Sequence, residues 1–417
     1  MENCIAESGA INRIEEFARQ WKTTSALIVG DVNTFSLAGD KIKEILEGMG
    51  IKTVSYIYRD ERLEPDENAV GRLIFEYNND IDLIVGIGSG VINDICKIIS
   101  NYTKTKYIIA ATAPMDGYAS PLSAMVKNGL KVTIPSKCAD AVLADTSIIK
   151  NAPIRMLKAG LGEMLSKYIS ICEWRIAHII LGETYFEDIA DNVMSAVKGC
   201  AADADKLAER DETAVKRLFE GLITTGESMV LAKMTRPASG GEHYMSHMWD
   251  MRGLEFGTPT MLHGSQVGLA AKICVKLYHK LENIVPDREK AIRYAESFDI
   301  EKWNLQLRSF LGKAAEPLIE LEKKERKYDL QKHRRRLEVI IEKWDEITAV
   351  IKNTLPSDAE MDNIFAQAQL PPALGDEPLD EETISMTVKA SKEMRDKYVL
   401  ARLLWDLGLT DEFCKGE

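Results

Sequence analysis

The sequence of 417 residues contains no apolar run near the roughly 18 residues that a membrane-spanning helix needs, and no Cys-x-x-Cys pair. Its seven cysteines are an odd number spread from Cys4 to Cys414, which fits neither a disulfide framework nor a zinc ribbon. The first ten residues also lack the basic and apolar pattern of a signal peptide. We therefore expect a cytoplasmic protein without stable membrane insertion.

A surplus of basic residues is missing as well. The 53 lysines and arginines stand against 65 aspartates and glutamates, which gives a formal net charge of −12. This balance argues against a dedicated nucleic-acid binder, so we expect no nucleic-acid partner. It does not exclude a small anion, because one lysine or one helix N-terminus can bind it. Histidine is scarce too, yet three of the six histidines fall between residues 243 and 263.

The first third of the chain alternates strand and helix patterns. Short apolar or β-branched runs predict strands over Ser25–Gly30, Thr53–Tyr58, Ile81–Gly86 and Tyr107–Ala110. Between the first two of these, Ile42–Gly50 has the pattern of an amphipathic helix that ends in glycine. Strands separated by helices indicate crossover units and a parallel sheet, in which ligands bind beyond the carboxyl ends of the strands.

From about residue 152 the pattern becomes helical. The segments that we predict to be helical are Asp188–Met234, Val267–Lys280, Asp287–Phe298, Leu318–Thr354 and Thr383–Leu407. Leu370–Asp380, which is rich in proline, reads as a loop. We therefore predict an α/β domain over residues 1–152 and an all-α domain over residues 153–417.

Two polar turns follow the third and fourth predicted strands. Gly86–Lys97 is rich in glycine and leads into a helix, which suits a pyrophosphate. The pattern is not GxGxxG, because Val91 stands where the third glycine would fall, and a tight turn without a ligand explains it equally well. In Ala111–Pro121, Asp116 can bind a substrate hydroxyl or only its own backbone.

A carboxylate and three histidines form the other candidate site. Ala159–Lys167 reads as the start of a helix with Glu163 in the first turn, where the helix dipole alone would favour a carboxylate. His243 and His247 are four residues apart and so share one helix face, and His263 precedes an apolar helix. Imidazoles plus a carboxylate are typical of a catalytic divalent-metal site, although each histidine alone is unremarkable. HExxH is absent, which disfavours a zincin-type protease.

Five segments together resemble one family in order and spacing: GSGVINDICK, TAPMDGYASP, AGLGEMLSKY, RPASGGEHYMSH and LHGSQVG. The chain is similar to the sn-glycerol-1-phosphate dehydrogenases, which belong to the iron-containing alcohol dehydrogenase and dehydroquinate synthase-like superfamily. The similarity runs from about Leu27 to His279 and resumes weakly over Ser385–Leu407. It implies a dehydroquinate synthase-like fold, in which an α/β dinucleotide-binding domain with a parallel sheet precedes an all-α domain that binds metal and substrate.

The resemblance also implies roles for particular residues. Glu163, His243 and His263 correspond to the metal ligands, although most members have aspartate where Glu163 stands. Asp116 and His247 correspond to catalytic residues that, with Glu163, contact the substrate. NAD(H) or NADP(H) would lie over the glycine-rich turn and the second turn, with one carboxylate near the adenosine; these positions are Asp31, Gly88, Ser89, Gly90, Val91, Ile92, Ala111, Thr112, Ala113, Pro114 and Ser120.

The implied reaction is the reversible, metal-assisted reduction of dihydroxyacetone phosphate by NAD(P)H to sn-glycerol 1-phosphate, a precursor for phospholipid synthesis. One divalent ion, Zn, Ni or Fe, and a homodimer are implied too. Asp31 would favour NAD by repelling a 2′-phosphate. Lys167 and Arg236 flank the motifs and are candidates for binding the substrate phosphate. A glycerol or polyol dehydrogenase of the same superfamily and a non-catalytic nucleotide-binding relative remain alternatives.

One basic run is not explained by this activity. Lys323–Arg336 carries eight lysines and arginines against two acids. It could touch anionic lipid, but a solvated helix face is the more favoured interpretation.

Overall fold

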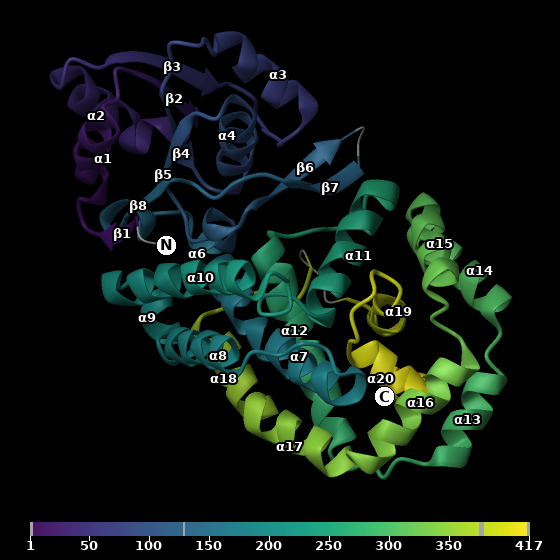
Figure 1. Ribbon diagram of the computed structural model, residues 1–417. Coiled ribbons are helices and arrows are strands. Elements are labelled where there is room, and N and C mark those ends of the chain that lie inside the picture. Colours follow the sequence, from purple (N-terminus) through teal and green to yellow (C-terminus); the bar gives the residue numbers. More distant parts are fainter. Residues whose placement is uncertain (1–2, 128–129, 375–378, 415–417) are drawn as a thin grey trace. The chain divides into compact units, whose positions relative to one another are not determined.

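The computed structural model describes residues 3–127, 130–374 and 379–414, and it divides the chain into two compact units (Figure 1). The first unit comprises Met1–Gly160 and Asp205–Lys233, and the second comprises Leu161–Ala204 and Met234–Glu417. This division differs from the predicted boundary at residue 152. Residues 205–233 return to the first unit, where Gly226 lies so close to Ala119 that an added Cβ would be 2.7 Å from the Ala119 Cβ.

The first unit contains all the strands of the described chain. Its elements are β1 (Cys4–Glu7), η1 (Ala10–Arg13), α1 (Ile14–Trp21), β2 (Ser25–Asp31), α2 (Phe35–Gly48), β3 (Lys52–Tyr58), α3 (Glu67–Glu76), β4 (Leu83–Gly88), α4 (Gly90–Thr103), β5 (Lys106–Ala111), η2 (Asp116–Ala119), β6 (Leu122–Lys127), β7 (Leu130–Pro135), β8 (Ala141–Asp145), α5 (Thr146–Ile149) and α10 (Glu212–Ala232).

Six of these strands form a parallel sheet in the order β1-β8-β5-β4-β2-β3, and β6 and β7 form a separate antiparallel hairpin. The central strands β2 and β4 are buried, apart from the half-buried Asp31 at the end of β2, as expected for a parallel sheet covered on both faces. Helices α1 and α2 pack on one face, over residues such as Ile28 and Val85. Helix α4 covers the other face, where Cys96 and Ile109 meet over Gly86.

The second unit contains helices and no strands among its described residues. Its elements are α7 (Lys167–Leu181), α8 (Glu187–Ala202), α11 (Gly241–Phe256), α12 (His263–Leu281), α13 (Arg288–Glu296), α14 (Ile300–Leu311), η3 (Gly312–Ala314), α15 (Ala315–Glu325), α16 (Leu330–Glu342), α17 (Trp344–Thr354), α18 (Asp358–Gln367), α19 (Glu381–Ser391), α20 (Leu400–Asp406) and α21 (Thr410–Phe413). Helices α6 (Ile154–Leu165) and α9 (Ala204–Ala208) cross the division between the units. No helix in the described ranges is long and apolar enough to span a bilayer.

Two glycines let α6 and α12 cross with their backbones in contact. A Cβ on Gly268 would lie 2.7 Å from the Cα of Gly162, and a Cβ on Gly162 would overlap the carbonyl oxygen of Gly264. Such a close approach is possible only without side chains at the crossing. The crossing brings the end of α6, which carries Glu163, beside the start of α12, which begins at His263.

Several predicted boundaries are wrong, and local packing explains them. Helix α2 begins seven residues before the predicted Ile42, because Gly39 accommodates the ring of Phe35 inside the helix. Strand β4 extends through Gly88 rather than ending at Gly86. The short strands β1 and β8 and the hairpin were not predicted. Part of the predicted loop Leu370–Asp380, residues 375–378, lies outside the described residues.

Two of the predicted helical segments are interrupted. The segment Leu318–Thr354 forms parts of three helices, because Arg326 adopts a left-handed conformation with φ 52° and Asp329 then caps a new helix. The segment Thr383–Leu407 breaks between α19 and α20, where the buried charges Lys392 and Glu393 lie. Hydrophobic periodicity continues through such breaks, so it does not reveal them.

The basic run Lys323–Arg336 is held by partners within the second unit. Arg336 makes two hydrogen bonds of 2.7 Å with the carboxylate of Asp406, and Arg334 pairs with Glu296. Lys327 donates to the backbone carbonyls of residues 392, 393 and 395. The run therefore serves largely to join helices, which weakens the interpretation as a lipid-binding surface.

The close crossing predicts a specific response to substitution. We expect Gly162→Ala to destabilise the protein by about 1–3 kcal/mol, because the added methyl overlaps backbone that cannot move freely. Denaturant unfolding measures the change. Gly48→Ala is the matched control, since a Cβ there meets nothing within 4 Å and should leave stability unchanged or raise it. Equal stability of the two variants would contradict the crossing.

Candidate functional site

The sheet has a topological switch point at β2. The chain passes from β2 to its neighbour β3 on one side, and then returns to pair β4 with the other side of β2. The connections that follow β2 and β4 therefore leave in opposite directions. Such a divergence opens a crevice beyond the carboxyl ends of β2 and β4, and parallel sheets bind ligands in crevices of this kind. Asp31 ends β2 and Gly88 ends β4, so both predicted nucleotide contacts flank this switch point.

The glycine-rich turn presents the N-terminus of α4. A Cβ on Gly88 would lie 2.7 Å from the Cβ of Ile92, so the turn is too tight for a side chain. In the described chain, the side chain of Ser89 makes no capping hydrogen bond at the start of α4. The first amides of a helix need partners, and an anion supplies them with the additional help of the helix dipole. The predicted stretch from Gly88 to Ile92 is therefore suited to a phosphate.

The second turn is tied to the first. The backbone N–H of Thr112, just after β5, donates to Gly88 O at 3.1 Å. Ala111 ends β5, Ala113 and Pro114 follow, and Asp116 opens η2. Ser120 ends this turn, and its Oγ accepts from the Leu122 N–H at 3.2 Å.

Sequence reasoning missed two buried residues that hold these turns together. The hydroxyl of Tyr118 donates to Ala113 O at 2.8 Å and approaches Gly88 O at 3.3 Å. Lys97 is fully buried, and its Nζ donates to Gly117 O at 3.1 Å and Leu122 O at 2.5 Å. A lysine on the buried face of an apolar helix was the available signal, since such a lysine needs polar partners.

Asp31 has a defined local role. Its Oδ1 accepts the backbone N–H groups of Asn33 at 2.8 Å and Thr34 at 2.9 Å, which shapes the turn after β2. The carboxylate is thus fixed at the carboxyl edge of the sheet, where an adenosine ribose is expected in a switch-point crevice.

In the second unit, three helices bring Glu163, His243 and His263 together. Their candidate ligand atoms all lie within 4.8 Å of one another. His243 is in the first turn of α11, and His263 is the first residue of α12. Glu163 is in the last turn of α6, whereas the sequence predicted it in the first turn of a helix. A helix dipole does not favour a carboxylate there, so the alternative explanation for Glu163 is wrong.

The two histidines direct the same kind of nitrogen at the Glu163 carboxylate. His243 Nε2 lies 3.2 Å from Oε1, and His263 Nε2 lies 3.9 Å from Oε2. Their other ring nitrogens are occupied, since His243 Nδ1 is 2.7 Å from Glu242 Oε1 and His263 Nδ1 is 3.1 Å from Ser246 Oγ. A metal-binding histidine commonly uses its second nitrogen in this way. The donor set and its surroundings therefore fit a divalent ion.

Electrostatics keep the carboxylate of Glu163 ionised. Burial opposes its charge, but the ammonium of Lys167 and the ring of His243 hold the pKa of Glu163 well below its usual range. Lys167 is itself fully buried and bonded directly to Glu163 Oε1. The site thus keeps an anionic oxygen ligand available for a cation.

His247 lies beside this group. Its ring stacks on His263 with the ring centroids 5.7 Å apart, and His243 meets His263 edge-on at 5.3 Å. The spacing of His243 and His247 along α11 does place both rings near His263, as the sequence predicted. His263 remains partly exposed, at 38% of its side chain, so the group is open on one side.

The structure does not support Lys167 and Arg236 as phosphate ligands. Lys167 also donates to Ala238 O at 2.9 Å. Arg236 is 2% exposed, and it donates to both carboxylate oxygens of Glu183 and to Tyr398 O. Both cations are buried on partners of their own, so neither presents a free charge to a substrate.

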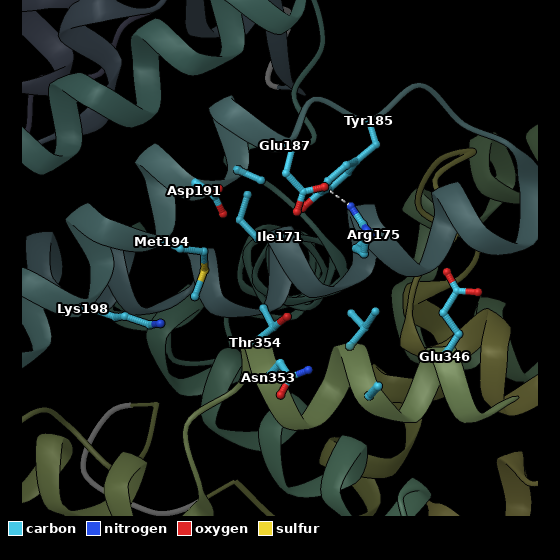
Figure 2. Close-up of a pocket in the computed structure, with 13 residues that line it drawn as sticks. Ile171, Arg175, Tyr185, Glu187, Asp191, Met194, Lys198, Glu346, Asn353 and Thr354 are labelled. Atoms are coloured by element: carbon cyan, nitrogen blue, oxygen red, sulfur yellow. Dashed lines mark hydrogen bonds and ion pairs between the residues drawn. The ribbon is translucent and has the colours of Figure 1, made fainter. Parts of the chain in front are cut away.

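A pocket of about 340 Å³ lies between α7, α8 and α17 in the second unit (Figure 2). Its described lining includes none of the three metal-binding candidates. Arg175 pairs with Glu187 and stacks over the ring of Tyr185 at 4.7 Å. Because these charges satisfy one another, the pocket gives no indication of a charged ligand.

Comparison with known proteins agrees with this geometry. Residues 5–153 match the family described as iron-containing alcohol dehydrogenase. The chain is 32% identical to glycerol-1-phosphate dehydrogenase [NAD(P)+] of Halalkalibacterium halodurans over 273 residues, which are 64% of this chain and 68% of that protein. It is 30% identical to the Bacillus subtilis protein of the same name over 305 residues, or 71% and 77% of the two chains.

Solved structures show the same fold at low sequence identity. The sulfoacetaldehyde reductase of Bifidobacterium kashiwanohense, in complex with NAD+, has a TM-score of 0.62 at 13% identity and covers 99% of this chain and 96% of its own. A probable glycerol dehydrogenase from Sinorhizobium meliloti has a TM-score of 0.60 at 16% identity, with 99% and 97% covered.

The family match and the curated relatives place the chain among the oxidoreductases of the iron-containing alcohol dehydrogenase class, and the solved structures share its fold. Within that class, the chain belongs to the glycerol-1-phosphate dehydrogenase family. The fold class and the family that the sequence motifs indicated are thereby confirmed.

The glycine-rich turn generates a first prediction for the site. We expect Gly88→Ala to weaken NADH binding at least tenfold, because the added methyl would displace Ile92 and the start of α4. Fluorescence titration with NADH measures the affinity. Gly71→Ala in α3 is the control, since a Cβ there meets nothing within 4 Å. An unchanged NADH affinity in Gly88→Ala would show that the glycine-rich turn does not bind the nucleotide.

The carboxylate and histidine group generates a second prediction. We expect Glu163→Gln to lose most of its bound divalent metal, because an amide is a much poorer ligand than a carboxylate. Metal analysis after dialysis against a weak chelator gives the stoichiometry. Glu187→Gln changes an exposed carboxylate of the same unit and should keep the wild-type metal content. Full retention of metal by Glu163→Gln would show that Glu163 is not a ligand.

Proposed function

We propose that the protein catalyses the reversible reduction of dihydroxyacetone phosphate to sn-glycerol 1-phosphate, with NAD(P)H as hydride donor and a divalent metal. The observation that carries the proposal is the group formed by Glu163, His243 and His263. It occurs in a chain that belongs to the glycerol-1-phosphate dehydrogenase family. One carboxylate oxygen and two imidazole nitrogens suit Zn, Ni or Fe.

A metal held by these residues would supply Lewis-acid stabilisation of the negative charge that develops on the C2 oxygen. The residues of the chain do the remaining work. Glu163 stays ionised because of Lys167, and the contacts to Glu242 and Ser246 turn both Nε2 atoms toward it. These positions are set before the substrate arrives, and preorganised groups of this kind contribute most to catalysis.

The reaction also needs a proton at the C2 oxygen once hydride has reached C2. We assign this proton transfer to His247, because its ring lies against His263 at the partly exposed side of the group. Asp116 is assigned to orient a substrate hydroxyl, as the resemblance implies. In the reverse direction His247 accepts the hydroxyl proton as hydride returns to the nicotinamide.

The nucleotide is assigned to the switch point of the first unit. The pyrophosphate would bind the amides at the start of α4, and Ala111–Pro114 and Ser120 would line the nicotinamide half. The carboxylate of Asp31 disfavours a 2′-phosphate and so favours NAD over NADP. As part of the same proposal, we place the enzyme in the cytoplasm as a homodimer. Its seven cysteines form no disulfide within the described chain, which is consistent with a reducing compartment.

One observation favours a second candidate, a polyol dehydrogenase that needs no phosphate site. The two cations nearest the motifs, Lys167 and Arg236, are both engaged by buried partners. A phosphate would then have to bind other residues or backbone amides, whereas dihydroxyacetone or glycerol would need none.

The substrate prediction separates these candidates. We expect the protein reconstituted with Zn or Ni to oxidise NADH with dihydroxyacetone phosphate, and to reach a kcat/KM at least 100-fold higher than with dihydroxyacetone. The product should be the sn-1 enantiomer, which chiral analysis identifies. Preference for dihydroxyacetone would establish the polyol dehydrogenase, and no turnover of either ketone would leave a non-catalytic relative.

A further inference from the structure

We propose that Glu242 is a positioning residue that supplies the negative charge behind His243 and so sets the metal affinity of the site. This inference rests on the proposed function only in taking Glu163, His243 and His263 as metal ligands. Glu242 directly precedes His243 and is fully buried in the first turn of α11.

The geometry of Glu242 fixes which ring nitrogen of His243 is left to bind a metal. Glu242 Oε1 lies 2.7 Å from His243 Nδ1 and accepts the backbone N–H of Gly240 at 2.8 Å. A carboxylate can only accept, so Nδ1 donates to Glu242, and Nε2 is the nitrogen whose lone pair a bound metal would use. That Nε2 is the atom directed at Glu163.

The charges around the group leave Glu242 with a distinct task. Glu163 is the only carboxylate among the three candidate ligands, and the buried ammonium of Lys167 is bonded to it. Lys167 therefore offsets much of the charge that Glu163 would offer to a divalent ion. Glu242 returns a negative charge to the site through the imidazole of His243, which makes that ring a stronger donor.

The fold does not need this charge for its own stability. Glu242 Oε2 is buried and has no hydrogen-bond partner among the described residues. It faces a second buried carboxylate, since a Cβ on Gly240 would lie 2.7 Å from Glu242 Oε2 and 2.5 Å from Glu173 Oε2. Burial, and then repulsion by Glu242, raise the pKa of Glu173 to about 7. A glutamine at position 242 would relieve this repulsion.

The positive charge of Lys397 only partly compensates for the negative charges of Glu242 and Glu173. Its Nζ donates to Ser239 O at 2.6 Å, and its charge interacts favourably with Glu242 and Glu173. Burial, and then the charge of Arg236, lower the pKa of Lys397 to about 7, which weakens its hold on a proton and so its compensation of the two carboxylates. A charge retained where the fold gains little from it indicates a role at the neighbouring site.

The decisive variant is Glu242→Gln. The N–H of Gly240 holds the amide oxygen in the place of Oε1, so His243 keeps its hydrogen bond and loses only the charge behind it. The new amide nitrogen takes the place of the unpartnered Oε2 and removes the like charge that faces Glu173. We expect the affinity for Zn²⁺, measured by competition with a chromophoric chelator, to fall about 10- to 100-fold. The melting temperature without metal should stay the same or rise.

Glu173→Gln is the matched control. Glu173 is equally buried and accepts the N–H groups of Gly241 at 2.7 Å and Leu400 at 2.8 Å, so an amide there loses a backbone hydrogen bond. It should lower the melting temperature and leave the Zn²⁺ affinity within about threefold of wild type, because Glu173 does not touch a metal ligand. Glu242→Asp keeps the charge, and we expect it to retain more affinity than Glu242→Gln.

The outcomes are separable from those of the proposed function. Wild-type Zn²⁺ affinity in Glu242→Gln, or greater loss in Glu242→Asp than in Glu242→Gln, would overturn the charge role of Glu242 even if the enzyme reduces dihydroxyacetone phosphate. If Glu242→Gln binds Zn²⁺ more weakly but the wild-type protein turns over neither ketone, the charge role of Glu242 is supported and the proposed activity is rejected. Failure of the wild type to bind any divalent metal would reject both.

Discussion

The carboxylate of Glu163 is the group around which the second unit is arranged. Three side chains approach it: Lys167 from the start of α7, His243 from α11 and His263 from α12. His247 in turn stacks on His263. Removing such a carboxylate from water is unfavourable unless partners replace the hydration. Lys167 does so permanently, and the histidines face it with donor atoms that also suit a metal. The need to surround the Glu163 carboxylate with these partners therefore constrains the positions of the helices that carry them.

Glycines at the helix contacts allow these side chains to come close together. Gly162 and Gly268 allow α6 and α12 to touch, and Gly240 and Gly241 leave space for two buried glutamates beside the start of α11. Each glycine lies within a few residues of a functional side chain. The glycines of the motifs thus serve packing between helices in this unit, whereas Gly88 in the first unit serves a tight turn at the end of a strand.

The motifs were sufficient to predict the α/β fold of the N-terminal part and the residues that gather in the second unit. Residues three or four apart share one helix face, and this spacing alone is enough to pair His243 with His247. The position of Glu163 was not predictable in the same way. The break at Ser166 separates α6 from α7 without proline or any change in polarity, so the segment reads as one starting helix. The supporting residues Tyr118 and Lys97 escaped because they donate to backbone carbonyls of other segments, and hydrophobic periodicity contains no information about such contacts. Glu242 escaped because its contact with the neighbouring His243 depends on side-chain geometry, which residue spacing does not give.

Both sites depend on a buried lysine, but the two lysines act differently. Lys97 donates to backbone carbonyls and lies 3.5 Å from Asp94 Oδ1, and so fixes the shape of a turn. Lys167 binds a carboxylate that is itself a candidate ligand, and so changes the charge that a metal would meet. A site with one ligand carboxylate already paired to an ammonium has less attraction for a divalent cation than its residue types suggest. The net charge behind the histidines then matters more, which is the physical reason for the role that we propose for Glu242.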